Sequence, residues 1–235
     1  MRLQVTKSFF FEAARKSACP SAPVTGCSYR VDVSAAGALD PRYGWIVDFS
    51  DIKTAVAPLV RQLDHALLDA VPGLENTAPE GIRTWILDRL TPRPSWLADI
   101  RITALSVDAF ILQDLPPAPS ENLPARVTFA FAAAQALDAL PQGHPCRNLH
   151  GHTYRVEVAV DGLNVPAIRV RLETCLAGVF DLLNNRCLNE VPGLNPPTCE
   201  RLAAWLWERL IAAGLRPELV VIQETHKNRC ECRPS

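Results

Sequence analysis

A repeat with a spacing of 120 residues constrains this chain more than any other feature of its sequence. The segment Val71-Pro72-Gly73-Leu74 returns as Val191-Pro192-Gly193-Leu194. The spacing between the two copies rises once, to 125 positions where Tyr29 matches Tyr154, and then returns to 120. A register kept over many positions is typical of a duplicated unit. Further pairs at the spacing of 120 are Glu80 and Glu200, Trp85 and Trp205, and Leu90 and Leu210.

A proline-rich segment separates the two copies. Residues 116–124 hold four prolines in nine positions, which indicates a stiff, extended linker. We therefore predict a first unit over residues 1–115 and a second unit over residues 125–235. The length of 235 residues suits two domains of about 100 residues each.

Both copies show the same order of strand, strand, helix, helix and strand. Alternating and apolar segments predict strands at residues 2–12, 28–36, 100–112, 126–134, 153–161 and 219–224. Helical patterns cover residues 51–68, 79–90 and 198–213. This order predicts an α+β fold of two tandem units, each an antiparallel sheet with two helices on one face.

Composition excludes several classes of protein. The 24 basic and 25 acidic residues give a net charge of −1, so no basic field exists to capture nucleic acid. No apolar run reaches the ~18 residues of a membrane span, and the N-terminus lacks the pattern of a secretory signal. The eight cysteines therefore do not indicate a disulfide framework, and we expect a cytoplasmic protein with reduced thiols.

The segment around residue 150 carries the strongest chemical signal. His150 and His152 are two positions apart at the start of a predicted strand, so both imidazoles can face the same side and bind zinc. Cys146 precedes them by four positions, and a thiolate near a metal is a suitable base or nucleophile. This pattern predicts a metal-dependent reaction rather than two surface histidines.

The motif Cys146-x3-His150-Gly151-His152, followed by an alternating strand, resembles the signature of the 6-pyruvoyltetrahydropterin synthase and 6-carboxytetrahydropterin synthase superfamily. The resemblance implies the tunnelling fold, and it extends twice over nearly the whole chain. Residues 71–76 are particularly similar to the 6-carboxytetrahydropterin synthases of queuosine biosynthesis. Other similar segments are residues 44–49, 63–65, 195–200 and 221–225.

The resemblance implies a set of residue roles. Cys146 is expected to be the base, Asp64 and His65 a proton relay, and Glu224 the anchor of the pterin ring. The expected metal is zinc on His150, His152 and Gln135, and the expected substrate-binding set adds Thr225 and Thr198, which can also cap a helix.

The two copies lack complementary parts of this set. The second copy reads Asn184-Asn185 where the first has Asp64-His65. The first copy reads Thr25-Gly26-Cys27 in place of the histidine motif and has Ala104 at the anchor position. Because family sites form between subunits, this matched loss predicts one composite site.

Gln135 is the main departure, because it stands where the family has a third zinc histidine. An amide oxygen is a poorer zinc ligand than imidazole. Three outcomes stay open: Gln135 ligates weakly together with water, His144 or His226 replaces it, or zinc is absent.

The resemblance implies a lyase that converts 7,8-dihydroneopterin triphosphate to 6-carboxytetrahydropterin in queuosine biosynthesis. Alternatives are a related pterin reaction, which forms a pyruvoyl or a hydroxymethyl product, and a non-catalytic pterin-binding protein. Candidate cations for the triphosphate are Arg15, Arg147, Lys227 and Arg229. The expected assembly is a homo-oligomer, a trimer of fused chains.

Overall fold

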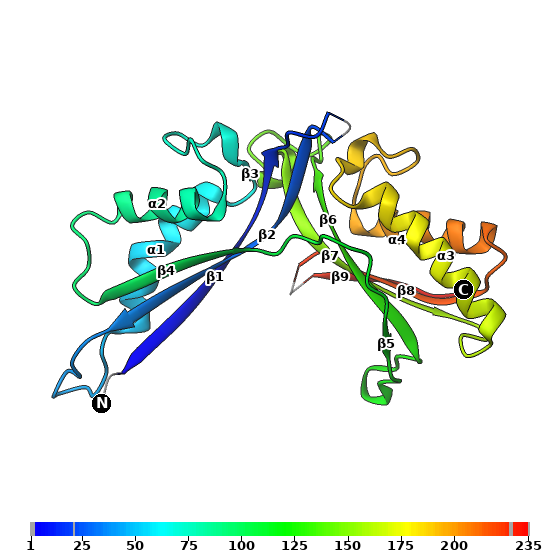
Figure 1. Ribbon diagram of the computed structural model, residues 1–235, viewed down its shortest axis with the longest axis horizontal. Coiled ribbons are helices and arrows are strands. Elements are labelled where there is room, and N and C mark those ends of the chain that lie inside the picture. Colours follow the sequence, from blue (N-terminus) through cyan, green and yellow to red (C-terminus); the bar gives the residue numbers. More distant parts are fainter. Residues whose placement is uncertain (1–2, 21, 226–227, 235) are drawn as a thin grey trace.

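The computed structural model describes residues 3–20, 22–225 and 228–234 and contains two sheets, each accompanied by two α-helices (Figure 1). The first sheet has the strand order β3-β1-β2-β4, and the second has the order β5-β6-β7-β8-β9. All strand pairs are antiparallel except the short β3, which runs parallel to β1. The predicted α+β fold of two tandem units is confirmed.

The elements of the first sheet and its helices are β1 (Gln4–Lys16), β2 (Val24–Ala36), α1 (Phe49–Leu63), β3 (Ala66–Leu67), the 3-10 helix η1 (Leu68–Ala70), α2 (Pro79–Arg89) and β4 (Leu97–Ala104). Those of the second are β5 (Gln113–Leu115), β6 (Arg126–Gln135), β7 (His150–Val160), α3 (Pro166–Leu183), the 3-10 helix η4 (Leu188–Glu190), α4 (Cys199–Ala212), β8 (Pro217–Gln223) and β9 (Arg229–Cys232). Two further 3-10 helices lie in loops, η2 (Pro119–Glu121) and η3 (Pro145–Arg147).

Two elements are shorter than the sequence pattern predicts. The helix expected over residues 51–68 ends at Leu63, because His65 adopts a left-handed backbone conformation with φ of 55°. The strand expected over residues 100–112 ends at Ala104, where its pairing with β2 stops. The first of these differences matters for the site, since it places Asp64 and His65 in a turn.

The proline-rich segment folds back on itself rather than extending. Ala118 and Leu123 form a β-bridge around η2, and Asn122 closes the turn with φ of 55°. Hydrogen bonds between residues 118 and 123 therefore override the extended preference of the prolines. Residues 113–115, which the sequence analysis places in the first unit, pair with β6 in the second sheet.

Each sheet packs its apolar face against its own helices. In the first core, Phe11 and Tyr29 stack with ring centroids 4.7 Å apart, and in the second, Phe131 and Tyr154 stack at the same distance. The two copies thus share the same core geometry, as the sequence repeat predicts. In the described part of the chain, no helix is long and apolar enough to cross a membrane. All eight cysteines are free thiols.

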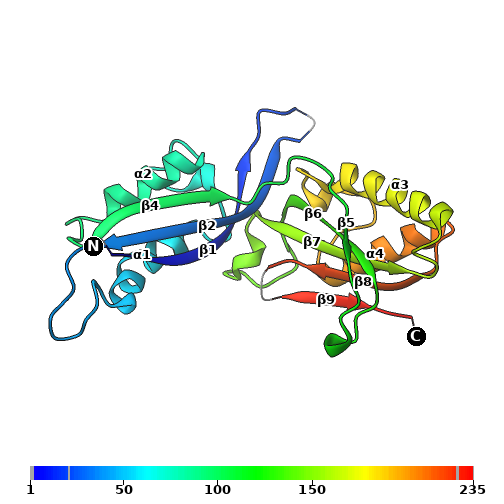
Figure 2. The same ribbon diagram turned by 60° about the horizontal axis from the view of Figure 1, so that its bottom comes forward.

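The two sheets meet where β1 and β2 approach β6 and β7 near the middle of the molecule (Figures 1 and 2). Gly26 and Gly151 occupy equivalent repeat positions and touch each other there. A Cβ on Gly26 would lie 2.6 Å from the Cα of Gly151. Ser28 and Thr153, again equivalent, exchange hydrogen bonds, because the amide of each donates to the hydroxyl of the other at 3.0 and 3.1 Å. The junction is therefore close to two-fold symmetric.

The Gly26→Ala variant is expected to be less stable than the wild type by about 1–3 kcal/mol, because the new methyl group collides with backbone. The matched control is Gly178→Ala in α3, where a Cβ meets nothing within 4 Å. That change should stabilise the helix by about 0.5–1 kcal/mol. Denaturant unfolding measures both; equal stability of the two variants would contradict the tight junction.

Candidate functional site

Three imidazoles from both sheets gather at this junction. His150 and His152 begin β7, while His65 follows α1 in the first copy. One ligand nitrogen from each of the three lies within 4.8 Å of the others. The ring centroids of His65 and His150 are 4.5 Å apart, and those of His150 and His152 are 4.9 Å apart. Chain segments separated by more than 80 residues therefore build one cluster.

The turn after α1 places His65 in this cluster. Asp64 ends the helix, and its Oδ1 accepts a hydrogen bond from the amide of Glu12 at 2.9 Å. The amide of His65 in turn donates to the carbonyl of Glu12 at 2.6 Å. Asn184 and Asn185 form the same two contacts with Ala132 in the second copy, at the same distances, 2.9 and 2.6 Å. The backbone role of this pair is thus kept in both copies.

An oxygen atom faces the Nδ1 atom of each imidazole. That of His150 lies 2.7 Å from the carbonyl oxygen of Asn148, and that of His152 lies 3.1 Å from Glu12. The Nδ1 of His65 lies 3.0 Å from the carboxylate of Asp64. When Nδ1 carries the proton, Nε2 keeps a free lone pair, which is the usual arrangement around a metal-binding histidine.

Charges around the cluster tune its imidazoles. Burial, followed by the neighbouring His152, lowers the pKa of His150 to about 3, so its ring is neutral at physiological pH. The contact with Asp64 raises the pKa of His65, while burial acts in the opposite direction. Burial opposes ionisation of Asp64, yet hydrogen bonds from His65 and from the Glu12 amide lower its pKa overall.

The cluster fits a zinc ion on its own chemistry. The Nε2 of His150 is buried and has no hydrogen-bond partner among the described residues, which is costly unless a ligand occupies its lone pair. Three neutral imidazoles are a common zinc donor set that leaves a position open. His65, His150 and His152 are therefore the residues that could hold the metal.

Gln135 lies beside this cluster, but its amide is used elsewhere. Its nitrogen donates to Glu224 at 2.8 Å, and its oxygen accepts a hydrogen bond from the hydroxyl of Tyr154 at 2.7 Å. The same Glu224 oxygen lies 3.5 Å from the Nε2 of His152. Gln135 thus connects the expected anchor to the sheet, and both ends of its amide are occupied.

Cys146 lies in η3, in the loop before β7. Burial raises the pKa of its thiol, and the negative charges of Glu224 and Asp64 raise it further. His144 in the same loop is exposed and accepts a hydrogen bond from the amide of Cys146 at 3.2 Å. His226 lies outside the described residues.

The remaining predicted residues divide into two groups. Thr225 and Glu12 line a cavity of about 270 Å³ between the two sheets, which leaves Thr225 in reach of a ligand. Thr198, by contrast, caps α4 by accepting a hydrogen bond from the amide of Arg201 at 3.2 Å.

Among the candidate cations, Arg147 donates to loop carbonyls, Arg229 pairs with acidic side chains, and Lys227 lies outside the described residues.

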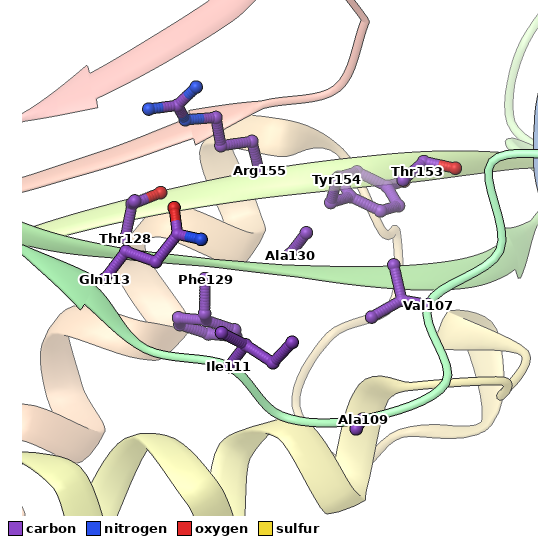
Figure 3. A pocket seen from close by; sticks show the side chains of 10 residues that line it. All are labelled: Val107, Ala109, Ile111, Gln113, Thr128, Phe129, Ala130, Thr153, Tyr154 and Arg155. Carbon is purple, nitrogen blue, oxygen red and sulfur yellow. The ribbon is translucent and has the colours of Figure 1, made fainter.

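A second cavity, of about 320 Å³, lies beside β6 and β7 under the segment that follows β4 (Figure 3). Its lining is mainly apolar, with Val107, Ile111 and Phe129 among its side chains. Among the described residues of this lining, Arg155 is the one charged side chain, and it pairs with Glu157 at 3.3 Å. The same described residues include no imidazole, thiol or carboxylate for acid–base chemistry.

Glu12 is the main residue that the sequence analysis misses. It is 8% exposed, bonds to His152, and accepts a hydrogen bond from the hydroxyl of Ser28 at 2.6 Å. The signal was available, since an acidic residue interrupts the apolar segment Phe9-Phe10-Phe11 and Ala13-Ala14. Buried charges are rarely tolerated without a partner, so such an interruption indicates a function.

Comparison with known proteins identifies the family. The model of the 6-pyruvoyl tetrahydropterin synthase family matches residues 4–108 and again residues 125–235, so the chain belongs to this family and carries two of its units. The resemblance inferred from the motifs is confirmed.

Individual relatives match about one unit of the chain. The 6-pyruvoyl tetrahydrobiopterin synthase of Drosophila melanogaster is 33% identical over 97 residues, which cover 35% of this chain and 58% of that protein. The 6-carboxy-5,6,7,8-tetrahydropterin synthase of a Synechocystis strain is 34% identical over 97 residues, 37% of this chain and 74% of that protein. The solved 6-pyruvoyl tetrahydropterin synthase of Caenorhabditis elegans has 20% identity and a TM-score of 0.39, and covers 55% of this chain and 100% of its own.

Proposed function

We propose that this protein is a zinc-dependent pterin lyase with one composite site per chain. The carrying observation is that His65 of the first copy lies with His150 and His152 of the second, next to Glu224. The proposed reaction converts 7,8-dihydroneopterin triphosphate and water to 6-carboxytetrahydropterin, acetaldehyde and triphosphate. This places the protein in 7-deazaguanine or queuosine biosynthesis.

We propose His65, rather than Gln135, as the third zinc ligand. This choice is supported by the amide of Gln135, which is occupied by Glu224 and Tyr154. Asp64, at 3.0 Å from Nδ1 of His65, orients the ring as a carboxylate partner behind a metal ligand. This role of the Asp64–His65 pair replaces the proton relay that the resemblance implies.

The other residues bind the substrate and move its protons. Bound zinc would supply Lewis acidity toward an oxygen of the substrate side chain, which acidifies the neighbouring C–H bond. Cys146, in the loop before β7, takes that proton. Glu224 accepts the parallel N–H bonds of the pterin ring, and Thr225 contacts the ligand from the adjoining cavity.

The test is metal content together with turnover of 7,8-dihydroneopterin triphosphate by the purified full chain. We expect about one zinc per chain and release of acetaldehyde. Formation of a pyruvoyl or hydroxymethyl pterin instead would assign the related reactions. Absence of both metal and turnover would refute the lyase and favour a pterin-binding protein.

The Glu224→Ala variant is expected to bind pterin about 30- to 150-fold more weakly, because a buried N–H edge loses a charged partner worth about 2–3 kcal/mol. Pterin fluorescence measures the affinity. Glu218→Ala is the matched control, since Glu218 is exposed on β8, the strand that ends just before Glu224. Unchanged affinity of the Glu224 variant would remove the anchor role.

A further inference from the structure

Because the junction is close to two-fold symmetric, the candidate site has a symmetry-related counterpart at the same junction, formed by the equivalent residues of the two copies. A cavity of about 430 Å³ lies there. Residues from both sheets line it, and six of them occupy positions equivalent to site residues. The cavity residues, each followed in parentheses by the equivalent site residue, are Arg15 (Gln135), Thr25 (His150), Cys27 (His152), Ala104 (Glu224), Ala132 (Glu12) and Asn185 (His65).

The side chains that line this cavity of about 430 Å³ differ in chemistry from those of the candidate site. The imidazoles and carboxylates of the site set are all replaced at the equivalent positions, so the zinc-binding and pterin-anchoring sets are not repeated there. The one charged replacement is Arg15. The acidic residue of the lining, Asp108, is exposed and forms no ion pair with Arg15 in the described part of the chain.

Arg15 is half-buried and lines the cavity together with Cys27 and Tyr29. Burial raises the pKa of Cys27 to about 11, and the charge of Arg15 acts against that rise. The same charge opposes the rise in the pKa of the buried Tyr29 hydroxyl. The positive charge of Arg15 therefore acts on other groups of the cavity lining.

We propose that this cavity binds a phosphate group of a small molecule through Arg15. A guanidinium donates two parallel hydrogen bonds to phosphate oxygens. Ser17 and Ser106 line the same cavity, and their hydroxyls supply further donors, which a four-oxygen anion uses better than a carboxylate. The hydroxyl of Thr25 donates to Asn185 at 2.9 Å, which ties the cavity to both copies.

The experiment is calorimetric titration of the full, metal-loaded chain with inorganic phosphate and, separately, with inorganic triphosphate. We expect saturable binding to the wild type. In Arg15→Gln, one site per chain should be lost or weakened at least about tenfold. Glutamine stands at the equivalent place of β6, so the fold tolerates it. Arg15→Lys keeps the charge and should retain part of the affinity.

The control is Arg101→Gln, which removes the same charge from an exposed position on β4 and should leave binding unchanged. His150→Ala should also retain the phosphate site, so a failure of the lyase proposal leaves this result interpretable. No saturable binding to the wild type would overturn the proposal, as would equal losses in the Arg15 and Arg101 variants. Stronger binding of triphosphate than of phosphate would indicate a polyphosphate ligand.

Discussion

The His150→Ala variant is expected to purify without zinc and to lose at least about 1,000-fold of turnover, since a catalytic metal supplies several kcal/mol. The imidazole removed is the one whose buried Nε2 has no partner among the described residues. His65→Ala should lower zinc affinity as well, because we assign it as a ligand. Metal analysis and Co²⁺ spectra measure both effects independently of activity.

The matched control is His144→Ala, which removes an exposed imidazole from the loop before β7. It should keep its zinc. Normal zinc affinity in His65→Ala would show that His65 is not a ligand and would restore the proton relay with Asp64. Full zinc content in His150→Ala would refute the metal centre altogether.

The Cys146→Ala variant is expected to lose turnover by about 100- to 10,000-fold, the usual contribution of a general base, while its zinc content and melting temperature stay unchanged. Cys146 is not part of the imidazole cluster, so its removal leaves the ligands in place. Turnover and metal content of one preparation test both statements.

Cys175→Ala is the control for this variant. Its thiol lies in α3 against the carbonyl of Arg209, so we expect normal turnover. If Cys146→Ala retained full activity, Cys146 would have no part in the reaction. A loss of zinc in Cys146→Ala would instead indicate a ligand role.

The sequence predicted the repeat, the fold and the convergence of residues from both copies, because each depends on patterns that span many positions. Adjacent residues on a helix do not face each other, so a contact between Asp64 and His65 requires the helix to end or bend at this pair. The structure meets this need by ending α1 at Leu63. The same turn brings His65 to the two other imidazoles.

What the sequence missed depends on contacts between distant segments. Periodicity extends the first helix to Leu68, but it ends at Leu63, where His65 turns left-handed and Asp64 and His65 bond to Glu12. The role of Gln135 is equally invisible in the sequence, because its partners Tyr154 and Glu224 come from other strands. The short β5 and β9 carry too few residues for a readable pattern.

Because β5 and β9 are short, the edge strands of the two sheets differ in length. β5 and β9 flank the second sheet, whereas the first ends in β4 on one side and, beyond the two residues of β3, in β1 on the other. Open strand edges are where chains join laterally. In the described part of the chain, the first sheet therefore offers longer free edges than the second. The first sheet is therefore the better suited of the two to lateral pairing with another chain.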